Sequence, residues 1–211
     1  MSPLKSLVPM VRRSRIRLAV IGSVCGTLVL AANVHPIGAQ TDGPPLPLHL
    51  TAFAVNMSGV GPASAGTVDI TIERWSTDGE HDRLLDVLVQ NGSEKLLSTL
   101  QDSKRRAGFI NAPGQLGWAI HYARWQPGED GGYRVIFATD RPISFWEARA
   151  NPRSRDYEFM LCEIHMGGNG VGEGKLANLA KVSYDKKEKQ IEIENYGIEP
   201  VRLTEVKVSG K

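Results

Sequence analysis

Apolar and polar residues alternate along most of the chain beyond residue 47, which is the pattern of strands buried on one face. The clearest stretch is 68–73, where Val, Ile and Ile alternate with Asp, Thr and Glu. Similar strands are expected at 48–57, 107–111, 116–126, 132–139, 143–148, 157–166, 176–184, 190–196 and 201–208. The short connections at 128–132, 185–189 and 196–200 predict hairpins, and therefore antiparallel neighbours.

The period changes between residues 77 and 103, where leucines recur at helical spacing. Thr77 and Glu80 have the spacing of a capping box, in which a hydroxyl and a carboxylate satisfy free amides at a helix start. Asn91-Gly92 supplies a left-handed cap that ends this helix, and a second short helix is expected over 94–102.

These elements together predict an α+β fold that is mainly antiparallel β. We expect a barrel-like or two-layer sheet of about ten strands, with a two-helix insertion near residues 78–103. Of the two arrangements, the barrel-like form is preferred.

Residues 1–39 have the composition of a secretory signal peptide. Five basic residues and no acidic residue precede an apolar run at 18–32. This run of 15 residues is shorter than the roughly 20 that a membrane-spanning helix requires. We expect cleavage after Ala39, with a cut near Ala32 as the alternative, and no stable membrane span afterwards. The mature protein would be periplasmic or secreted, with a Pro-rich tether at 40–47 and a single globular β-rich domain at 48–211.

Removal of the signal would change the charge of the chain. The sequence holds 25 Lys and Arg against 23 Asp and Glu, and the signal contains five of the basic residues, so the remainder has 20 basic against 23 acidic residues and a formal net charge of −3. A mildly acidic domain lacks the positively charged surface that is typical of a protein that binds nucleic acids. Cys25 would leave with the signal, and Cys162 would remain as a buried, unreactive thiol in an apolar strand.

Four aromatic residues fall at even spacings along two strands that are expected to pair. They are Trp118, Tyr122, Tyr133 and Phe137. On the inner face of a barrel they would line its mouth and hold a small apolar ligand. The alternative is that they belong to the hydrophobic core.

A second candidate region is the charged connection at 140–156, which contains Arg141 and Arg149. Guanidinium groups bind carboxylates with two parallel hydrogen bonds, so these arginines would suit a ligand or a partner protein of the cell envelope. The alternative is an internal ion-pair network, since Asp and Glu residues lie close by in the sequence.

His165 and Glu163 lie two residues apart on one strand face, and with His121 they form a metal-site alternative. The competing interpretation of the pair is an ordinary solvated strand face. The glycines at 167–174 do not have the spacing of a phosphate-binding loop, and we expect a hairpin loop there. The sequence assigns no catalytic residue and no cofactor.

Three segments resemble a family of uncharacterised exported bacterial proteins of unknown function. They are Arg74-Trp75-Ser76-Thr77-Asp78, Ala138-Thr139-Asp140-Arg141-Pro142-Ile143, and Ile193-Glu194-Asn195-Tyr196 with Pro200-Val201-Arg202-Leu203. The resemblance covers most of the chain after the signal. It implies export, and it assigns no activity, ligand or catalytic residue.

The leading hypothesis is therefore an exported non-enzymatic domain that binds a small apolar molecule or a partner protein. The first alternative is a hydrolase or metal-dependent enzyme of an unfamiliar type. The second is a structural component of the cell envelope.

Overall fold

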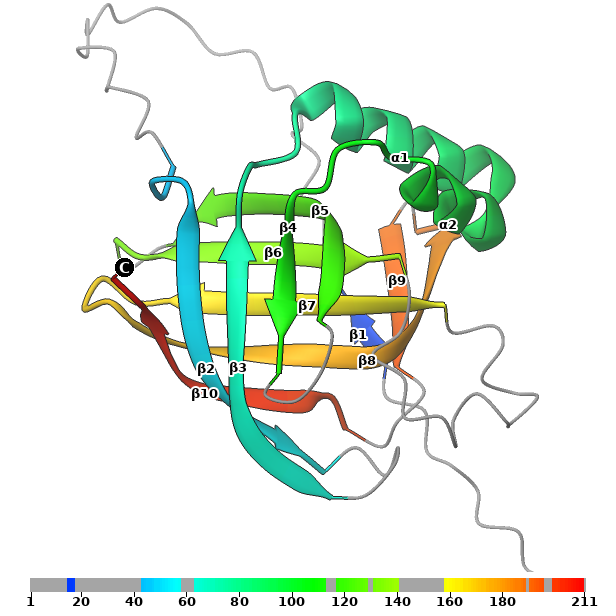
Figure 1. Cartoon of the computed structure of the whole chain (residues 1–211). Coiled ribbons are helices and arrows are strands. Elements are labelled where there is room, and N and C mark those ends of the chain that lie inside the picture. Colours follow the sequence, from blue (N-terminus) through cyan, green and yellow to red (C-terminus); the bar gives the residue numbers. More distant parts are fainter. Residues whose placement is uncertain are drawn as a thin grey trace, which may run out of the picture.

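The computed structural model of the chain is an antiparallel β-barrel with two helices against its outside (Figure 1). It describes residues 43–57, 63–112, 117–128, 131–140, 158–188, 190–195 and 199–210, and the backbone of 15–17. The strands are β1 (Arg15–Arg17), β2 (Leu48–Asn56), β3 (Ser64–Ile72), β4 (Gly108–Asn111), β5 (Trp118–Pro127), β6 (Tyr133–Thr139), β7 (Phe159–Met166), β8 (Val171–Asp185), β9 (Gln190–Asn195) and β10 (Val201–Val208). The helices are α1 (Asp78–Asn91) and α2 (Ser93–Gln101).

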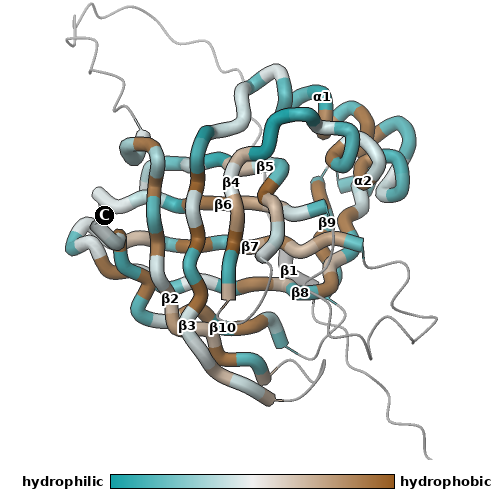
Figure 2. The backbone as a smooth tube through the Cα atoms, viewed as in Figure 1, coloured by the Kyte–Doolittle hydropathy of each residue, from teal (hydrophilic) through white to brown (hydrophobic). Residues whose placement is uncertain are grey.

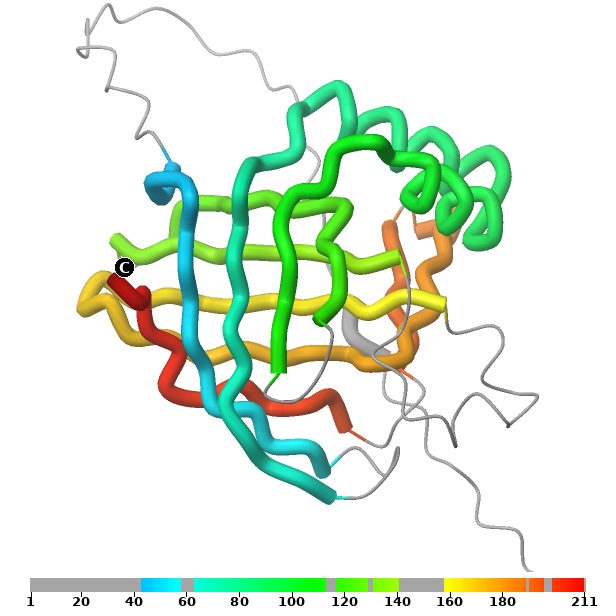
Figure 3. Tube along the Cα trace, viewed as in Figure 1, coloured from blue at the N-terminus to red at the C-terminus, as the bar shows by residue number. Residues whose placement is uncertain are grey.

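Eight strands close the barrel, because each of them pairs with two neighbours around a ring. The order is β2, β3, β4, β5, β6, β7, β8 and β10, with β10 pairing back to β2, and every pair is antiparallel. Figure 3 shows the chain following this ring in sequence order, from β2 in blue-cyan to β10 in red. Just beyond β10, the amide of Ser209 donates to the carbonyl of His49 at 2.9 Å. The predicted fold class and its barrel-like form are confirmed.

The predicted hairpins divide into two that are confirmed and one that is wrong. Residues 128–132 join the paired strands β5 and β6, and residues 185–189 join the paired strands β8 and β9. The strands on either side of 196–200 do not pair with each other, because β9 pairs with the second half of β8 whereas β10 pairs with β2 and with the first half of β8. The strand expected at 143–148 lies outside the described residues.

Strand β8 is 15 residues long and belongs to two parts of the fold. Its first half closes the ring between β7 and β10, and its second half, from Ala180 to Asp185, pairs with β9. The backbone of β1 pairs with the outer edge of β9, with Arg15 opposite Glu194. Cleavage after Ala39, as the sequence predicts, would remove β1 from the mature chain.

Inward-facing side chains fill the barrel and form the main hydrophobic core. Ile120, Val135 and Phe137 have no exposed surface. Figure 2 shows apolar and polar residues alternating along the strands, as expected for a sheet whose inner face is buried and whose outer face is exposed to solvent. Cys162 is buried in this core, and burial raises the pKa of its thiol well above the ordinary value, which agrees with the unreactive cysteine predicted from the sequence.

The two helices form a second core on the outside of the barrel. Leu88 of α1 and Leu96 and Leu100 of α2 are buried against the outer face of β7 and β8. The predicted capping box is present, since the Thr77 hydroxyl accepts from the Glu80 amide and the Glu80 carboxylate accepts from the Thr77 amide. Gly92 ends α1 with φ at 82°, a value that favours glycine. The two-helix insertion near residues 78–103 is therefore confirmed.

The glycine-rich loop is shorter than expected, because β8 already begins at Val171. Gly172 and Gly174 lie inside this strand, opposite Met166 and Ile164 of β7. A Cβ at Gly174 would stand 2.6 Å from the carbonyl oxygen of Glu163, closer than such contacts allow. These two glycines therefore let neighbouring strands approach, and the strand pattern missed them because they carry no side chain.

Candidate binding site between the helix pair and the barrel

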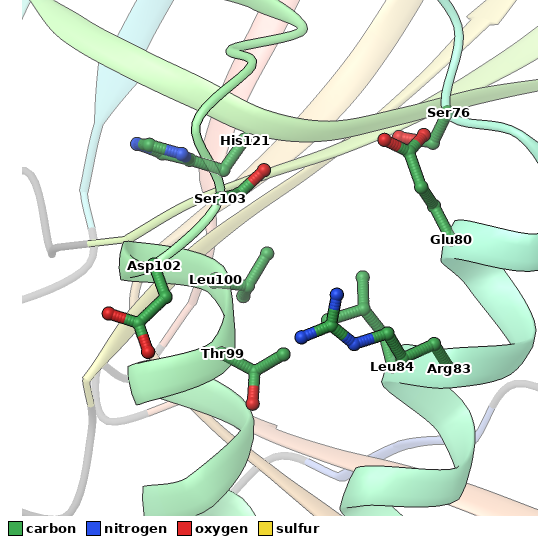
Figure 4. A pocket seen from close by; sticks show the side chains of 9 residues that line it. All are labelled: Ser76, Glu80, Arg83, Leu84, Thr99, Leu100, Asp102, Ser103 and His121. Carbon is green, nitrogen blue, oxygen red and sulfur yellow. The ribbon is translucent and has the colours of Figure 1, made fainter.

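A pocket opens where residues 73–103 lie over strand β5, a contact that we call the seam (Figure 4). Its volume is about 80 Å³. It is lined by Ser76, Glu80, Arg83, Leu84, Thr99, Leu100, Asp102, Ser103 and His121. The lining residues come from the connection before α1, from both helices, from the turn after α2 and from β5. The pocket therefore exists only because the helix pair is docked on the barrel.

Arg74 fixes the start of α1 to the chain that leads into β4. Its guanidinium donates to the carbonyls of Arg106 at 3.1 Å and Arg105 at 2.7 Å, and to the Glu80 carboxylate at 2.8 Å. Hydrogen bonding by Arg74 lowers the pKa of Glu80, and the Thr77 amide adds to this effect. Glu80 is thus held as a paired carboxylate at the pocket wall.

Ser76 continues this attachment by pairing with β5 much as a strand would. Its amide donates to the carbonyl of Ala123 at 2.7 Å, and its hydroxyl oxygen accepts from the amide of Ala123 at 3.1 Å. The Ser76 hydroxyl proton is not used by either bond, so it remains available to the pocket.

A β-bulge places two polar side chains of β5 next to each other under the helices. Ile120 pairs with Thr139 and Tyr122 pairs with Ala138, so His121 is the extra residue. Ile120 faces the barrel core, whereas Tyr122 packs against the helix core and His121 lines the pocket. The bulge therefore turns both His121 and Tyr122 to the outside.

Tyr122 binds the first turn of α1. Its hydroxyl lies 2.8 Å from Nδ1 of His81, and the two rings stack with their centroids 6.1 Å apart. Burial raises the pKa of Tyr122 to about 12, and burial together with the charge of Arg124 lowers the pKa of His81. Arg124 also forms an ion pair with Asp78 at 2.8 Å. The contact between Tyr122 and His81 is thus made by two neutral rings at neutral pH.

His121 has one ring nitrogen engaged and one unsatisfied. Its Nε2 lies 3.6 Å from a carboxylate oxygen of Asp140, and its side chain is 13 % exposed. Its Nδ1 is buried and has no hydrogen-bond partner among the described residues. The carboxylate favours a proton on Nε2, so Nδ1 carries a lone pair, which is enclosed by the protein and is not open to the pocket.

Two serines line the pocket with His121, which raises the question of nucleophilic catalysis. The Ser76 oxygen is held by the Ala123 amide, and the Ser103 hydroxyl donates to the carbonyl of Arg105 at 3.4 Å. A serine nucleophile requires a hydrogen bond to its base. Within the described part of the chain neither hydroxyl makes that bond to His121.

The structure separates the four aromatic residues that the sequence placed at a barrel mouth. Phe137 is fully buried in the barrel core, and Trp118 and Tyr133 are partly buried against that core. Tyr122 is on the opposite face of the sheet, under the helices. The expectation of one shared face is corrected, because the bulge at His121 reverses the alternation between Trp118 and Tyr122.

The arginines proposed as ligand-binding residues, Arg141 and Arg149, lie outside the described residues. Asp140, the first residue of that charged connection, is described and belongs to the site through its contact with His121.

The structure brings together two residues of the metal-site alternative, His165 and Glu163, and leaves His121 apart from them. His165 Nε2 lies 3.1 Å from Glu163 Oε1, and Arg134 binds the same carboxylate at 3.2 Å. His121 is level with Thr139, whereas His165 is opposite Arg134, about 15 Å further along the strands. Across residues 43–210, as far as they are described, no three His, Cys, Asp or Glu side chains gather as a metal site.

Sequence reasoning missed most of the pocket. Arg83, Thr99, Asp102 and Ser103 belong to no motif, and only the capping box pointed to Glu80. Ser76 could have been found from the sequence, because it lies within the Arg74–Asp78 segment that carries the family resemblance.

Fold and site together define a class of protein: a filled antiparallel barrel with a small polar pocket on its outer face. No family model matches the chain, and no curated protein or solved structure matches it either. Among the described residues, no helix has the length and apolar character needed to cross a bilayer.

Proposed function

We propose that the protein is an exported, non-enzymatic domain that binds a small molecule in the pocket at the seam. The observation that carries the proposal is the pocket itself, a cavity of about 80 Å³ lined by charged and hydroxyl-bearing side chains. One of them, Ser76, accepts a hydrogen bond from the amide of Ala123 and keeps its hydroxyl proton for a ligand.

Because side chains fill the interior of the barrel, a ligand site on its outer surface is favoured over a ligand site at its mouth. The inward residues of the ring are almost all less than about a tenth exposed, and the pocket is lined by hydroxyl and charged groups. Such a lining suits a polar ligand better than the apolar ligand that the aromatic spacing first indicated.

Export forms the second part of the proposal. It is supported by the basic and apolar pattern of residues 1–39 and by the resemblance to exported bacterial proteins. We also propose that the chain belongs to that family. A partner protein of the envelope at the same seam, or a purely structural role there, is the competing outcome.

Ligand binding can be tested by thermal shift with a panel of small polar compounds at millimolar concentration. We expect one chemical class to raise the melting temperature of the natural protein and to lose this effect in His121→Leu. His165→Leu is the matched control, since His165 is exposed on β7 away from the pocket. No compound raising the melting temperature, or equal effects in both variants, would contradict the proposal.

A further inference from the structure

The outer edge of β9 lies against a strand that cleavage of the signal would remove. One edge of β9 pairs with the second half of β8, and the other pairs with the backbone of β1, which Figure 1 shows in blue beside the orange β9. Apart from β1, no strand in the described part of the chain reaches this edge. Removal of residues 1–39, which is part of the proposed function, would therefore leave the outer edge of β9 unpaired.

An unpaired strand edge can accept another strand, because its free amide and carbonyl groups form a template for pairing. Proteins protect such edges with bulges, with covering segments or with charged side chains. β9 pairs with β8 over all six of its residues and has no bulge. Its backbone is therefore regular enough to be extended, and its side chains decide which strand can be added.

The side chains of β9 differ between its two faces. Ile191 and Ile193 are partly buried against the helix core. Glu192 and Glu194 alternate with them and so belong to the opposite face. On β8, a lysine is opposite Glu194, whereas the uncharged Ser183 is opposite Glu192, so β8 offers no neutralising charge directly across from Glu192.

A strand that pairs with this edge has to match both faces, because residues directly opposite each other in an antiparallel pair lie on the same face. Opposite charges at such positions stabilise the pair, and like charges destabilise it. β1 meets this requirement by its register, in which Arg17, Ile16 and Arg15 are opposite Glu192, Ile193 and Glu194. The edge is therefore suited to a basic, apolar, basic sequence.

A second copy of the chain does not fit the edge. If β9 paired antiparallel with β9 of another molecule, the isoleucine faces of the two strands would lie on the same side of the joint sheet. In the registers that pair most of the strand, a glutamate of one copy would then be opposite a glutamate of the other. Like charges in these positions oppose self-association through β9.

We propose that in the exported protein the outer edge of β9 binds an extended basic segment of a partner polypeptide as an added antiparallel strand. The segment has basic residues opposite Glu192 and Glu194 and an apolar residue opposite Ile193. The inference rests on cleavage of the signal. It does not rest on small-molecule binding at the seam, because no residue of β9 lines that pocket.

The test measures binding of a synthetic peptide to residues 40–211, which contain the whole barrel, both helices and β9. The probe is the peptide of residues 12–19, Arg-Arg-Ser-Arg-Ile-Arg-Leu-Ala, followed by fluorescence anisotropy. We expect saturable binding, together with slower amide hydrogen exchange in β9. The same peptide with N-methyl groups on residues 15–17 keeps its charge but cannot pair as a strand, and we expect it to bind at least fivefold more weakly.

A charge exchange tests the register. Glu192→Lys is expected to weaken binding at least fivefold. Glu173→Lys makes the same change at an exposed residue in the first half of β8, opposite His165, and should leave binding within twofold. A peptide with Arg17→Glu should bind at least fivefold more tightly to Glu192→Lys than to the natural protein. An unfolded variant could not give this recovery, so the result also shows that Glu192→Lys is folded.

Three results would overturn the inference: no saturable binding, equal binding of the N-methylated peptide, or equal effects of Glu192→Lys and Glu173→Lys. Dimers of residues 40–211 with a protected β9 and no peptide would assign the edge to a second copy, against the inference. N-terminal sequencing of the exported protein tests the cleavage by itself. An exported chain that keeps residues 1–39 would contradict the cleavage and leave the edge of β9 to its own β1.

Discussion

Nδ1 of His81 lies 2.8 Å from the hydroxyl of Tyr122, which joins the first turn of α1 to the bulge of β5. The two residues are 41 positions apart in the sequence. His121, the neighbour of Tyr122, lines the pocket, so the same bulge that holds the helix also supplies a residue of the pocket wall. Docking of the helix pair and formation of the pocket are therefore coupled through adjacent residues.

Tyr122→Phe is expected to lower the free energy of unfolding by about 1–2 kcal/mol, because the part-buried Nδ1 of His81 would lose its partner. Urea denaturation followed by circular dichroism measures this change. Tyr184→Phe is the control, since Tyr184 packs against the same helix core. Equal stability of the two variants would show that the bond contributes nothing.

Stability should decrease as pH falls below 6.5 because of His81. Burial and Arg124 lower the pKa of His81 from its ordinary 6.5, so the unfolded chain binds the proton more readily than the folded one. The contribution is complete above pH 6.5 and is lost as pH falls through the lowered value. Glu73 and Glu80, whose pKa values lie below the ordinary 4.5, lose their contributions only at lower pH.

The urea concentration at which half of the protein is unfolded is measured at about pH 7.5 and pH 5.5. Comparing these two values separates the effect of His81 from that of the carboxylates, which titrate at lower pH. We expect the difference between the two midpoints to shrink in His81→Gln, which keeps an amide for Tyr122 but does not titrate. The same difference should persist in His165→Gln. A difference as large in His81→Gln as in the natural protein would refute the assignment.

Arg74→Lys is expected to destabilise the protein by about 1–3 kcal/mol, because an ammonium group cannot replace the fork that reaches two carbonyls and a carboxylate. The Arg74 side chain is only 19 % exposed, so water compensates poorly. Arg106→Lys alters an exposed ion pair with Glu73 and should leave the melting temperature nearly unchanged. Similar losses from both substitutions would argue against a special role for Arg74.

Gly174→Ala should lower stability by about 1–3 kcal/mol, since the added methyl group meets the Glu163 carbonyl at 2.6 Å and forces β7 and β8 apart. Gly66→Ala, in strand β3, adds a methyl group that meets nothing within 4 Å. Thermal unfolding of the two variants compares them directly. The prediction is wrong if Gly174→Ala melts at the temperature of Gly66→Ala.

Local sequence signals predicted much of the fold. The capping box at Thr77 and Glu80 and the glycine at 92 set the ends of α1, and alternation located most strands to within two residues. These signals work because each depends on a few consecutive residues whose own hydrogen bonds or burial they satisfy.

The candidate site could not be predicted in the same way, because it depends on contacts between distant segments. Arg74 meets residues 105 and 106, and Ser76 meets Ala123, and no local pattern encodes these pairs. The bulge was also hidden, since the residues around His121 carry no signature of an extra position, and its effect was to move Tyr122 to the other face.

The bond between Ser209 and His49 has a consequence for how the domain can be attached. It holds the start of β2 and the residues after β10 side by side, and Gly43, just before β2, lies against the indole of Trp125. In Figure 1 these segments are on the left, whereas the helix pair is at the upper right. A surface or a fused domain joined at either of these two places would therefore begin on the side of the barrel away from the helix pair.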